Sequence, residues 1–206
     1  MSKPAPPMSD RIMSRVRAKG RGWVFTPRHF IDFGTRGAVD MALSRLAKAG
    51  HIRRIDRGIY DYPRQHKKLG SLSPDSDRLA AALAVQSGES LALSGATAAN
   101  KLGLSTQVPA KASYVVSGHS RTRQAGGRSI ALRHSRAPIL ENAAESANAI
   151  MQALAYLGKG QVDADMIARF ASRISDKDMK ALLQARPAMS GWMGDVVLKI
   201  EGARHG

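Results

Sequence analysis

The sequence contains no cysteine. Disulfide bonds and thiolate metal sites are therefore excluded, which is consistent with a reducing cytoplasm. No run of about 18 apolar residues occurs, so we expect no transmembrane helix and no membrane partner. The first ten residues, MSKPAPPMSD, lack the apolar segment that a secretory signal needs. These absences predict a cytoplasmic protein.

Acidic residues are few relative to basic ones. The 206 residues include 32 Lys and Arg but only 16 Asp and Glu, so the formal net charge is +16. Residues 1–70 have a net charge of +11, residues 71–136 have +5, and residues 137–206 are neutral. Because the positive charge is concentrated in the first two-thirds of the chain, we expect a polyanion, and nucleic acid above all, to bind there. The alternative is a generally basic surface without a nucleic-acid partner.

The stretch from residue 35 to residue 63 has the pattern of a helix followed by a two-stranded ribbon. Thr35 is suited to cap the helix, and Gly50 fits just past its end. Two short alternating runs, 51–56 and 59–62, then predict a hairpin. The apolar residues of the helix are spaced three and four apart, which predicts one buried stripe made of Val39, Ala42, Leu43 and Leu46.

Three further elements are predicted before this stretch. They are a helix over 10–19, a short strand over 23–25, and a helix over 27–33 that would bury Phe30, Ile31 and Phe33. The order of helix, strand, helix, turn, helix and ribbon predicts a winged helix-turn-helix domain over residues 8–64, after a disordered arm over residues 1–7. A plain helical bundle with an attached hairpin is the alternative.

In such a domain, the helix that begins at Thr35 reads the DNA bases. Arg36 is suited to guanine, Ser44 or Asp40 to other bases, and Arg45 lies on the same outward face. The alternatives are that Asp40 pairs with Arg36 or Arg45, and that Arg36 is a solvated surface residue. The phosphate contacts are expected from basic residues around this helix, namely Arg21, Arg28, Lys48, Arg53, Arg54 and Arg57.

A second domain is expected after a polar linker over residues 65–74. Residues 75–206 predict a mixed α/β domain that ends in helices, so the fold class is α+β. A basic, glycine-containing loop, 118–127, is expected between strands over 112–117 and 128–134. Three arginines at this loop are candidates for binding a phosphate or an acidic partner, with a solvated loop tip as the alternative: Arg121, Arg123 and Arg128.

Patterns for catalysis or metal binding are weak. The six histidines have no metal-ligand spacing. Ser94 lacks the glycine two positions earlier that a nucleophile elbow requires, so helix capping explains it better. Two aspartate pairs, 163/165 and 176/178, stand at predicted helix starts, where the helix dipole favours acids. We therefore expect no enzyme activity, no metal and no cofactor.

The run GWVFTPRHFIDFGTRGAVDMALSRLAKAGHIRRIDRGIYDYPR, residues 22–64, resembles the N-terminal winged-helix domain of AbiEi-family antitoxins of type IV toxin–antitoxin systems. The matching features are the aromatic opening, the Asp32-Phe33 pair, the ALSRL helix and the RGIYDYP end of the ribbon. The segment LSGATAANKLGL and the basic strand pair resemble the second domain of that family. About 60 residues at the C-terminal end carry the least of this resemblance.

The resemblance implies a protein that represses its own operon by binding inverted repeats in the promoter. It also implies a C-terminal domain that counteracts a nucleotidyltransferase-like toxin, with or without a stable complex. Charge and loop position make Arg121, Arg123 and Arg128 the candidates for this toxin neutralisation. The positions that match the operator-binding elements of the family are Thr35, Arg36, Gly37, Asp40, Ser44, Arg53, Arg54 and Arg57.

Two other functions are compatible with the sequence. One is a stand-alone transcriptional regulator whose second domain senses a ligand or forms oligomers. The other is an enzyme that acts on nucleic acid and uses the winged helix for targeting, which the lack of a convincing metal or acid–base cluster disfavours.

Overall fold

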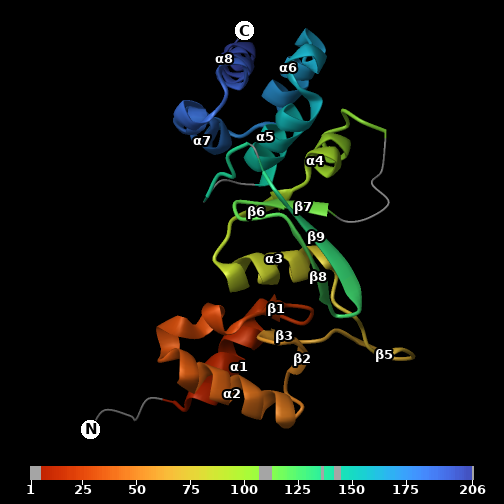
Figure 1. The fold of residues 1–206 in the computed structure, drawn as a ribbon, viewed down its shortest axis with the longest axis vertical. Helices are drawn as coiled ribbons and strands as arrows, with labels where there is room; N and C mark the ends of the chain where they lie inside the picture. The colour runs from red at the N-terminus through yellow and green to blue at the C-terminus, as the bar shows by residue number, and fades with distance from the viewer. Residues whose placement is uncertain (1–5, 107–112, 136, 142–144, 206) are drawn as a thin grey trace. The chain divides into compact units, whose positions relative to one another are not determined.

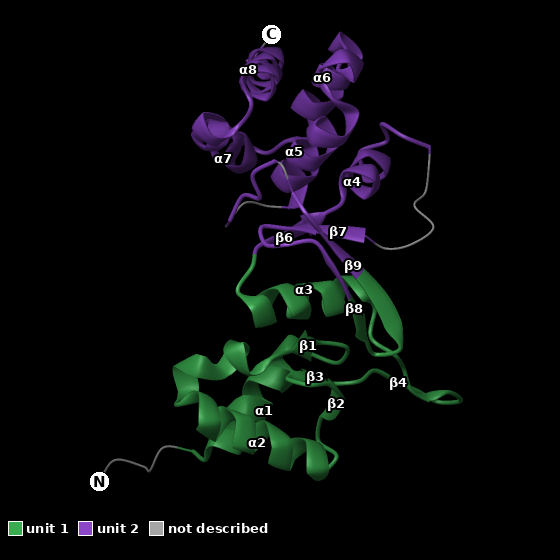
Figure 2. Cartoon of the chain, viewed as in Figure 1, with its two compact units in different colours: residues 1–89, 123–130 green, residues 90–122, 131–206 purple. Residues whose placement is uncertain are grey.

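A computed structural model describes residues 6–106, 113–135, 137–141 and 145–205 of the chain. The chain divides into two compact units, shown in different colours in Figure 2. Unit 1 comprises residues 1–89 and 123–130, whereas unit 2 comprises residues 90–122 and 131–206. The expected disordered arm lies outside the described residues except for Pro6 and Pro7.

Unit 1 begins with three helical segments and a three-stranded antiparallel sheet in the order β1–β3–β2 (Figure 1). The elements are α1 (Met8–Lys19), β1 (Val24–Phe25), the 3-10 helix η1 (Pro27–Phe33), α2 (Arg36–Lys48), β2 (Arg53–Asp56) and β3 (Ile59–Asp61). The helical segments contact one another around the rings of Phe25 and Phe30, which meet edge to face with centroids 5.6 Å apart. This is the element order of a winged helix-turn-helix, and the chain as a whole has the predicted α+β fold class.

The second helical segment differs from the expected one in its geometry. Residues 27–33 form a 3-10 helix that begins with a capping box, in which the Thr26 backbone N–H donates to His29 Nδ1 at 3.1 Å. A 3-10 helix has three residues per turn, so Phe30 and Phe33 share one side of it. The prediction that Ile31 is buried was wrong, because this side chain faces away from the core and is 60% exposed.

The segment expected to be a linker contains regular structure. Residues 65–74 include a small hairpin made of β4 (Gln65–His66) and β5 (Gly70–Ser71), and α3 (Ser76–Ser87) follows. The apolar face of α3 is buried, and the helix contacts β1 and η1. As a result α3 belongs to unit 1, and the first division of the chain falls after Glu89 rather than in the expected linker.

Strand β8 (Arg121–Ala125) replaces part of the expected loop over 118–127 and forms a hairpin with β9 (Arg128–His134). Its turn is Gly126-Gly127, with both φ angles positive as a two-residue hairpin turn requires. A Cβ built on Gly126 would lie 3.2 Å from the side chains of Ile55 and Pro74, so the turn packs closely on β2 and on the segment before α3. The prediction of a loop was wrong for residues 121–125, because their mostly exposed side chains give no alternating apolar pattern.

The four-stranded sheet has the order β6–β7–β9–β8, with β6 spanning Leu91–Leu93 and β7 spanning Ser113–Val116. Strand β7 runs antiparallel to β6 and parallel to β9. The sequence therefore identified β9 as the partner of β7, but the strand that forms a hairpin with β9 is β8. Helix α4 (Gly95–Lys101) follows β6.

The rest of unit 2 is helical, as predicted. The helices are α5 (Glu145–Leu157), η2 (Lys159–Gln161), α6 (Ala164–Arg173), α7 (Asp176–Ala185), η3 (Arg186–Ala188) and α8 (Gly191–His205). Their core includes Ile150, Leu154, Phe170, Leu182 and Val197, each 1% exposed or less. Within the described ranges, no helix is both long enough and apolar enough to cross a membrane.

Candidate nucleic-acid interface

Helix α2 presents one face to solvent because its opposite face fills the core of unit 1. Thr35 caps the helix by accepting a hydrogen bond from the Ala38 backbone N–H at 3.4 Å. The predicted stripe of Val39, Ala42, Leu43 and Leu46 is buried, which confirms the helical register. The opposite side, called the α2 face below, consists of Gly37, Met41, Ser44, Arg45 and Lys48.

Met41 is a member of the α2 face that the sequence reasoning missed. Its side chain is 58% exposed, which is unusual for a large apolar residue in a helix that packs on a core. An apolar side chain at this place can contact a thymine methyl group in the major groove. Its spacing of four from Gly37 and three from Ser44 was the signal that could have identified it.

Gly37 also leaves the α2 face open. A Cβ built on this glycine would have no heavy atom within 4 Å. The packing of the described residues therefore does not require glycine here, although glycine in a helix costs about 1 kcal/mol relative to alanine. A bare backbone at this position permits close approach of another molecule.

The acidic residue nearest this face is paired. Arg36 Nε donates to both carboxylate oxygens of Asp40, at 3.1 and 3.0 Å, across one helical turn. The alternative in which Asp40 pairs with Arg36 is therefore the one that the structure contains. The Arg36 side chain is 54% exposed, so the pair lies at the surface. In contrast, Arg45 and Lys48 are exposed and form no ion pair with any residue that the structure describes.

The arginines of the β2–β3 ribbon have different environments. Arg54 and Arg57 are exposed. Arg53 instead lies against buried Asp61, and its Nη2 atom also donates to the Leu72 carbonyl at 2.8 Å. The hydrogen bond from Arg53 to Asp61 raises the pKa of this guanidinium above its ordinary value. Arg53 was expected to contact phosphate, but its guanidinium has an internal partner. This distinguishes it from Arg54 and Arg57.

Two other expected phosphate contacts are placed by local packing. Arg28 of η1 is exposed, and a Cβ built on Gly88 at the end of α3 would lie 2.5 Å from its Nη1 atom. Its guanidinium thus lies at a helix C-terminus, where a positive charge is favoured. Arg21 stacks over the Tyr62 ring, 4.6 Å from its centroid, and donates to the Pro63 carbonyl at 3.0 Å.

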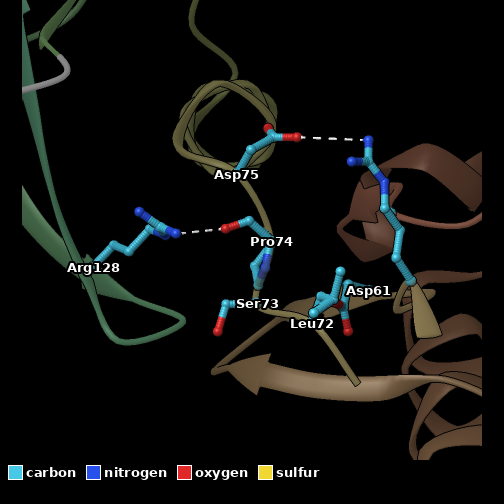
Figure 3. A pocket seen from close by; sticks show the side chains of 8 residues that line it. Asp61, Leu72, Ser73, Pro74, Asp75 and Arg128 are labelled. Atoms are coloured by element: carbon cyan, nitrogen blue, oxygen red, sulfur yellow. Dashed lines mark hydrogen bonds and ion pairs between the residues drawn. The ribbon is translucent and has the colours of Figure 1, made fainter. Parts of the chain in front are cut away.

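A small pocket of about 110 Å³ lies within unit 1, as Figure 3 shows. Arg128 lines it and donates from Nε to the Pro74 carbonyl at 3.1 Å. Asp75 lies on the other side of Pro74, caps α3 through the Arg78 N–H, and pairs with Arg64 at 3.9 Å. These interactions give Arg128 a role in attaching the β8–β9 turn to unit 1.

The other two arginines grouped with Arg128 have separate surroundings. Arg121 belongs to unit 2, where its Nη1 atom donates to the His119 carbonyl at 3.0 Å. Arg123 is exposed and belongs to unit 1. The three candidates for toxin neutralisation are therefore divided between the two units.

The residues considered for catalysis have structural contacts. Ser94 caps α4 through the Thr97 N–H at 3.4 Å and accepts a hydrogen bond from Ser113 Oγ at 2.8 Å. Asp163 caps α6 through the Met166 N–H at 2.8 Å, and Ser175 caps α7, so both aspartate pairs stand at helix starts as predicted. Among the described residues, no group of three or more His, Cys, Asp or Glu side chains could hold a metal ion.

A family model covering residues 11–182 matches this sequence. The chain belongs to the DUF6088 family, a family of unknown function. The match extends from α1 through most of α7 and therefore includes the α2 face, the β2–β3 ribbon and the β8–β9 hairpin. No curated protein has a significantly matching sequence.

Proposed function

We propose that this DUF6088 protein binds double-stranded DNA through the α2 face and represses transcription from its own promoter. The observation that carries the proposal is the composition of this face. It combines a hydroxyl, an exposed thioether side chain and two unpaired cations, while the nearby carboxylate of Asp40 is paired with Arg36. A helix of this kind in a winged helix-turn-helix domain is suited to enter the major groove.

The charge of the chain supports the same partner. Residues 1–70 contain 16 Lys and Arg but only 5 Asp and Glu. Two of those acids, Asp32 and Asp61, pair with arginines of the same unit, as Asp40 does. The field around the winged helix is therefore positive and attracts phosphates before any base contact forms.

The test compares duplexes that differ only in sequence. Full-length protein is titrated by fluorescence anisotropy with DNA from upstream of its own gene and with a shuffled duplex of the same composition, between 50 and 200 mM salt. We expect tighter binding to the upstream DNA and a steep loss of affinity with salt. Equal affinity for both duplexes would overturn the operator assignment.

Matched charge variants locate the interface. Arg45→Ala/Lys48→Ala removes two cations from the α2 face, and Lys159→Ala/Lys199→Ala removes two exposed cations from unit 2. If Arg45 and Lys48 each contact a phosphate, the first variant reduces the slope of log affinity against log salt concentration by about 2. The second variant should bind as the wild type does. Met41→Ala should reduce discrimination between the duplexes more than overall affinity.

We further propose that the protein is the antitoxin of a nucleotidyltransferase-like toxin and is not itself an enzyme. The support is the resemblance of residues 22–64 and of the LSGATAANKLGL segment to AbiEi-family antitoxins. Co-expression with the adjacent gene should rescue growth if that gene encodes such a toxin. Lack of rescue, or an unrelated neighbouring gene, would favour the stand-alone regulator. Magnesium-dependent nuclease or nucleotidyltransferase activity of the purified chain would contradict the non-enzymatic role.

A further inference from the structure

The turn of the β2–β3 ribbon is partly covered within unit 1, although this ribbon stands where a winged helix has its wing. Gln86 Nε2 of α3 donates to the Arg57 carbonyl at 2.9 Å. A Cβ built on Gly58 would lie 2.9 Å from the same nitrogen. The side chain of Arg57 is exposed, but the turn backbone is held by α3 and is poorly placed to enter a DNA groove.

The β4–β5 hairpin has the opposite character. Every residue from 64 to 71 is exposed. Lys67 and Lys68 lie in the turn, followed by Leu69, whose side chain is 72% exposed. No acidic residue occurs between Asp61 and Asp75. A basic hairpin that exposes a leucine at its tip has the composition of elements that enter the minor groove, where lysines meet phosphates and an apolar side chain wedges between bases.

Side-chain hydrogen bonds fix the shape of this hairpin. His66 Nδ1 accepts from the backbone N–H groups of Lys68 and Leu69, each at 3.2 Å. Gln65 Nε2 donates to Ser71 Oγ at 2.9 Å across the two strands. A hairpin of two-residue strands has little stability of its own. These bonds therefore hold the two lysines and Leu69 in a defined arrangement at the surface.

A groove of about 250 Å³ connects the hairpin to the end of α2. Gly50 and His51, which follow α2, line one part of it, and Gln65, the first residue of β4, lines another. Arg17 and Arg21 also line the groove. The groove between the end of α2 and the start of the hairpin thus contains two arginines, and Lys48 and Lys67 each lie two residues along the chain from a residue that lines it.

We propose that the β4–β5 hairpin is the second DNA-contacting element of this chain. Lys67 and Lys68 contact phosphates, and Leu69 enters the minor groove next to the major-groove segment that α2 occupies. This assignment rests on the proposed function of the α2 face. It also places the groove between α2 and the β4–β5 hairpin along the DNA backbone.

The test uses full-length Lys67→Ala/Lys68→Ala and the Lys159→Ala/Lys199→Ala control described above. With the upstream duplex at about 150 mM salt, the hairpin variant should bind about tenfold more weakly, with a salt slope reduced by about 2. Hydroxyl-radical footprinting should show minor-groove protection beside the α2 contact, and the hairpin variant should lose this protection. Thermal unfolding checks that the exposed hairpin variant keeps the wild-type fold.

Leu69→Ala tests the wedge separately from charge. With 2-aminopurine at the protected minor-groove step, wild-type protein should raise the fluorescence by unstacking the base, and Leu69→Ala should not. The variant should keep the wild-type salt slope, because it removes no cation.

The outcomes separate this proposal from the function on which it rests. If wild-type protein shows no preference for the upstream duplex, both proposals fail. If the wild type binds with preference but Lys67→Ala/Lys68→Ala keeps its affinity and salt slope, only the hairpin assignment fails. An acidic protein as the true partner of the hairpin would give that second result.

Discussion

Arg53 and Asp61 join strands β2 and β3 by an ion pair with two hydrogen bonds, Nε to Oδ1 at 3.0 Å and Nη2 to Oδ2 at 2.6 Å. The two residues are register partners in the antiparallel pairing. Asp61 is 1% exposed, so its charge has little contact with water. The same guanidinium donates to the Leu72 carbonyl, which attaches the segment before α3 to the ribbon. This arginine therefore has a clear role in stabilising unit 1.

Replacing Arg53 should destabilise unit 1. Arg53→Ala leaves the carboxylate of Asp61 buried without this partner. Breaking a buried pair costs about 3–5 kcal/mol, and the cost here should be at or below that range because the Arg53 side chain is 35% exposed. The free energy of unfolding is measured by urea denaturation monitored by tryptophan fluorescence, since Trp23 packs on the core of this unit. Arg54→Ala is the matched control, because Arg54 is exposed and should change stability by less than about 0.5 kcal/mol. Equal stability of the two variants would contradict this role.

Unit 1 should lose stability in mildly acidic solution because of His29. Burial lowers the pKa of this imidazole below its ordinary value of 6.5. The unfolded chain then binds the proton more tightly than the folded one, so the stabilising contribution is present above pH 6.5 and is lost as the pH falls through the folded pKa.

The variant His29→Gln isolates this effect. A glutamine oxygen at the same place in the capping box can accept the Thr26 N–H without titrating. Between pH 7.5 and 5.5, the melting temperature of the wild type should fall further than that of the variant. Parallel pH profiles for the two proteins would show that His29 does not carry the pH dependence.

Removing the acid beside the α2 face should increase affinity for DNA of any sequence. Asp40→Asn eliminates a negative charge and leaves Arg36 without its carboxylate partner. We expect severalfold tighter binding to the shuffled duplex and a smaller ratio of specific to non-specific affinity. Loss of the surface pair should cost only about 0.3–0.5 kcal/mol of stability. Unchanged binding to the shuffled duplex would place Asp40 away from the DNA.

Unit 2 should be sensitive to the size of residue 95. A Cβ built on Gly95 of α4 would lie 2.6 Å from the Gln152 carbonyl oxygen of α5. Because a backbone atom cannot move aside cheaply, Gly95→Ala should destabilise the protein by about 1–3 kcal/mol. Gly202 of α8 has no heavy atom within 4 Å of such a Cβ, so Gly202→Ala should instead stabilise by about 0.5–1 kcal/mol. Chemical denaturation of both variants measures the free energy of unfolding, which should fall for Gly95→Ala and rise for Gly202→Ala.

The elements that the sequence predicted well are those defined by neighbouring residues. The buried stripe of α2 follows from a spacing of three and four, and the predicted caps Thr35 and Ser94 each act on a backbone group three residues later. The 3-10 geometry of η1 was missed because helical spacing does not distinguish three residues per turn from 3.6, and this error misplaced Ile31.

Other features depend on residues far apart in the chain. The pairing of Arg53 with the Leu72 carbonyl and the close packing of Gly126 on Ile55 and Pro74 leave no local pattern in the sequence. Local patterns therefore predicted neither the internal role of Arg53 nor the membership of residues 123–130 in unit 1. For the candidate interface, periodicity correctly oriented α2, and the same spacing places the exposed side chain of Met41 on the α2 face, although no apolar residue was expected among the contacts there.

The return of residues 123–130 to unit 1 affects the order in which the protein can fold during synthesis. The Gly126 turn and Arg128 complete contacts with Ile55, Pro74 and Leu79, so unit 1 is unfinished when Glu89 leaves the ribosome. At about 5–20 residues per second, the missing segment follows after a delay of roughly 2–8 s. A nascent chain that stalls in this interval carries an incomplete unit 1, and the proposed operator binding would require translation beyond residue 130.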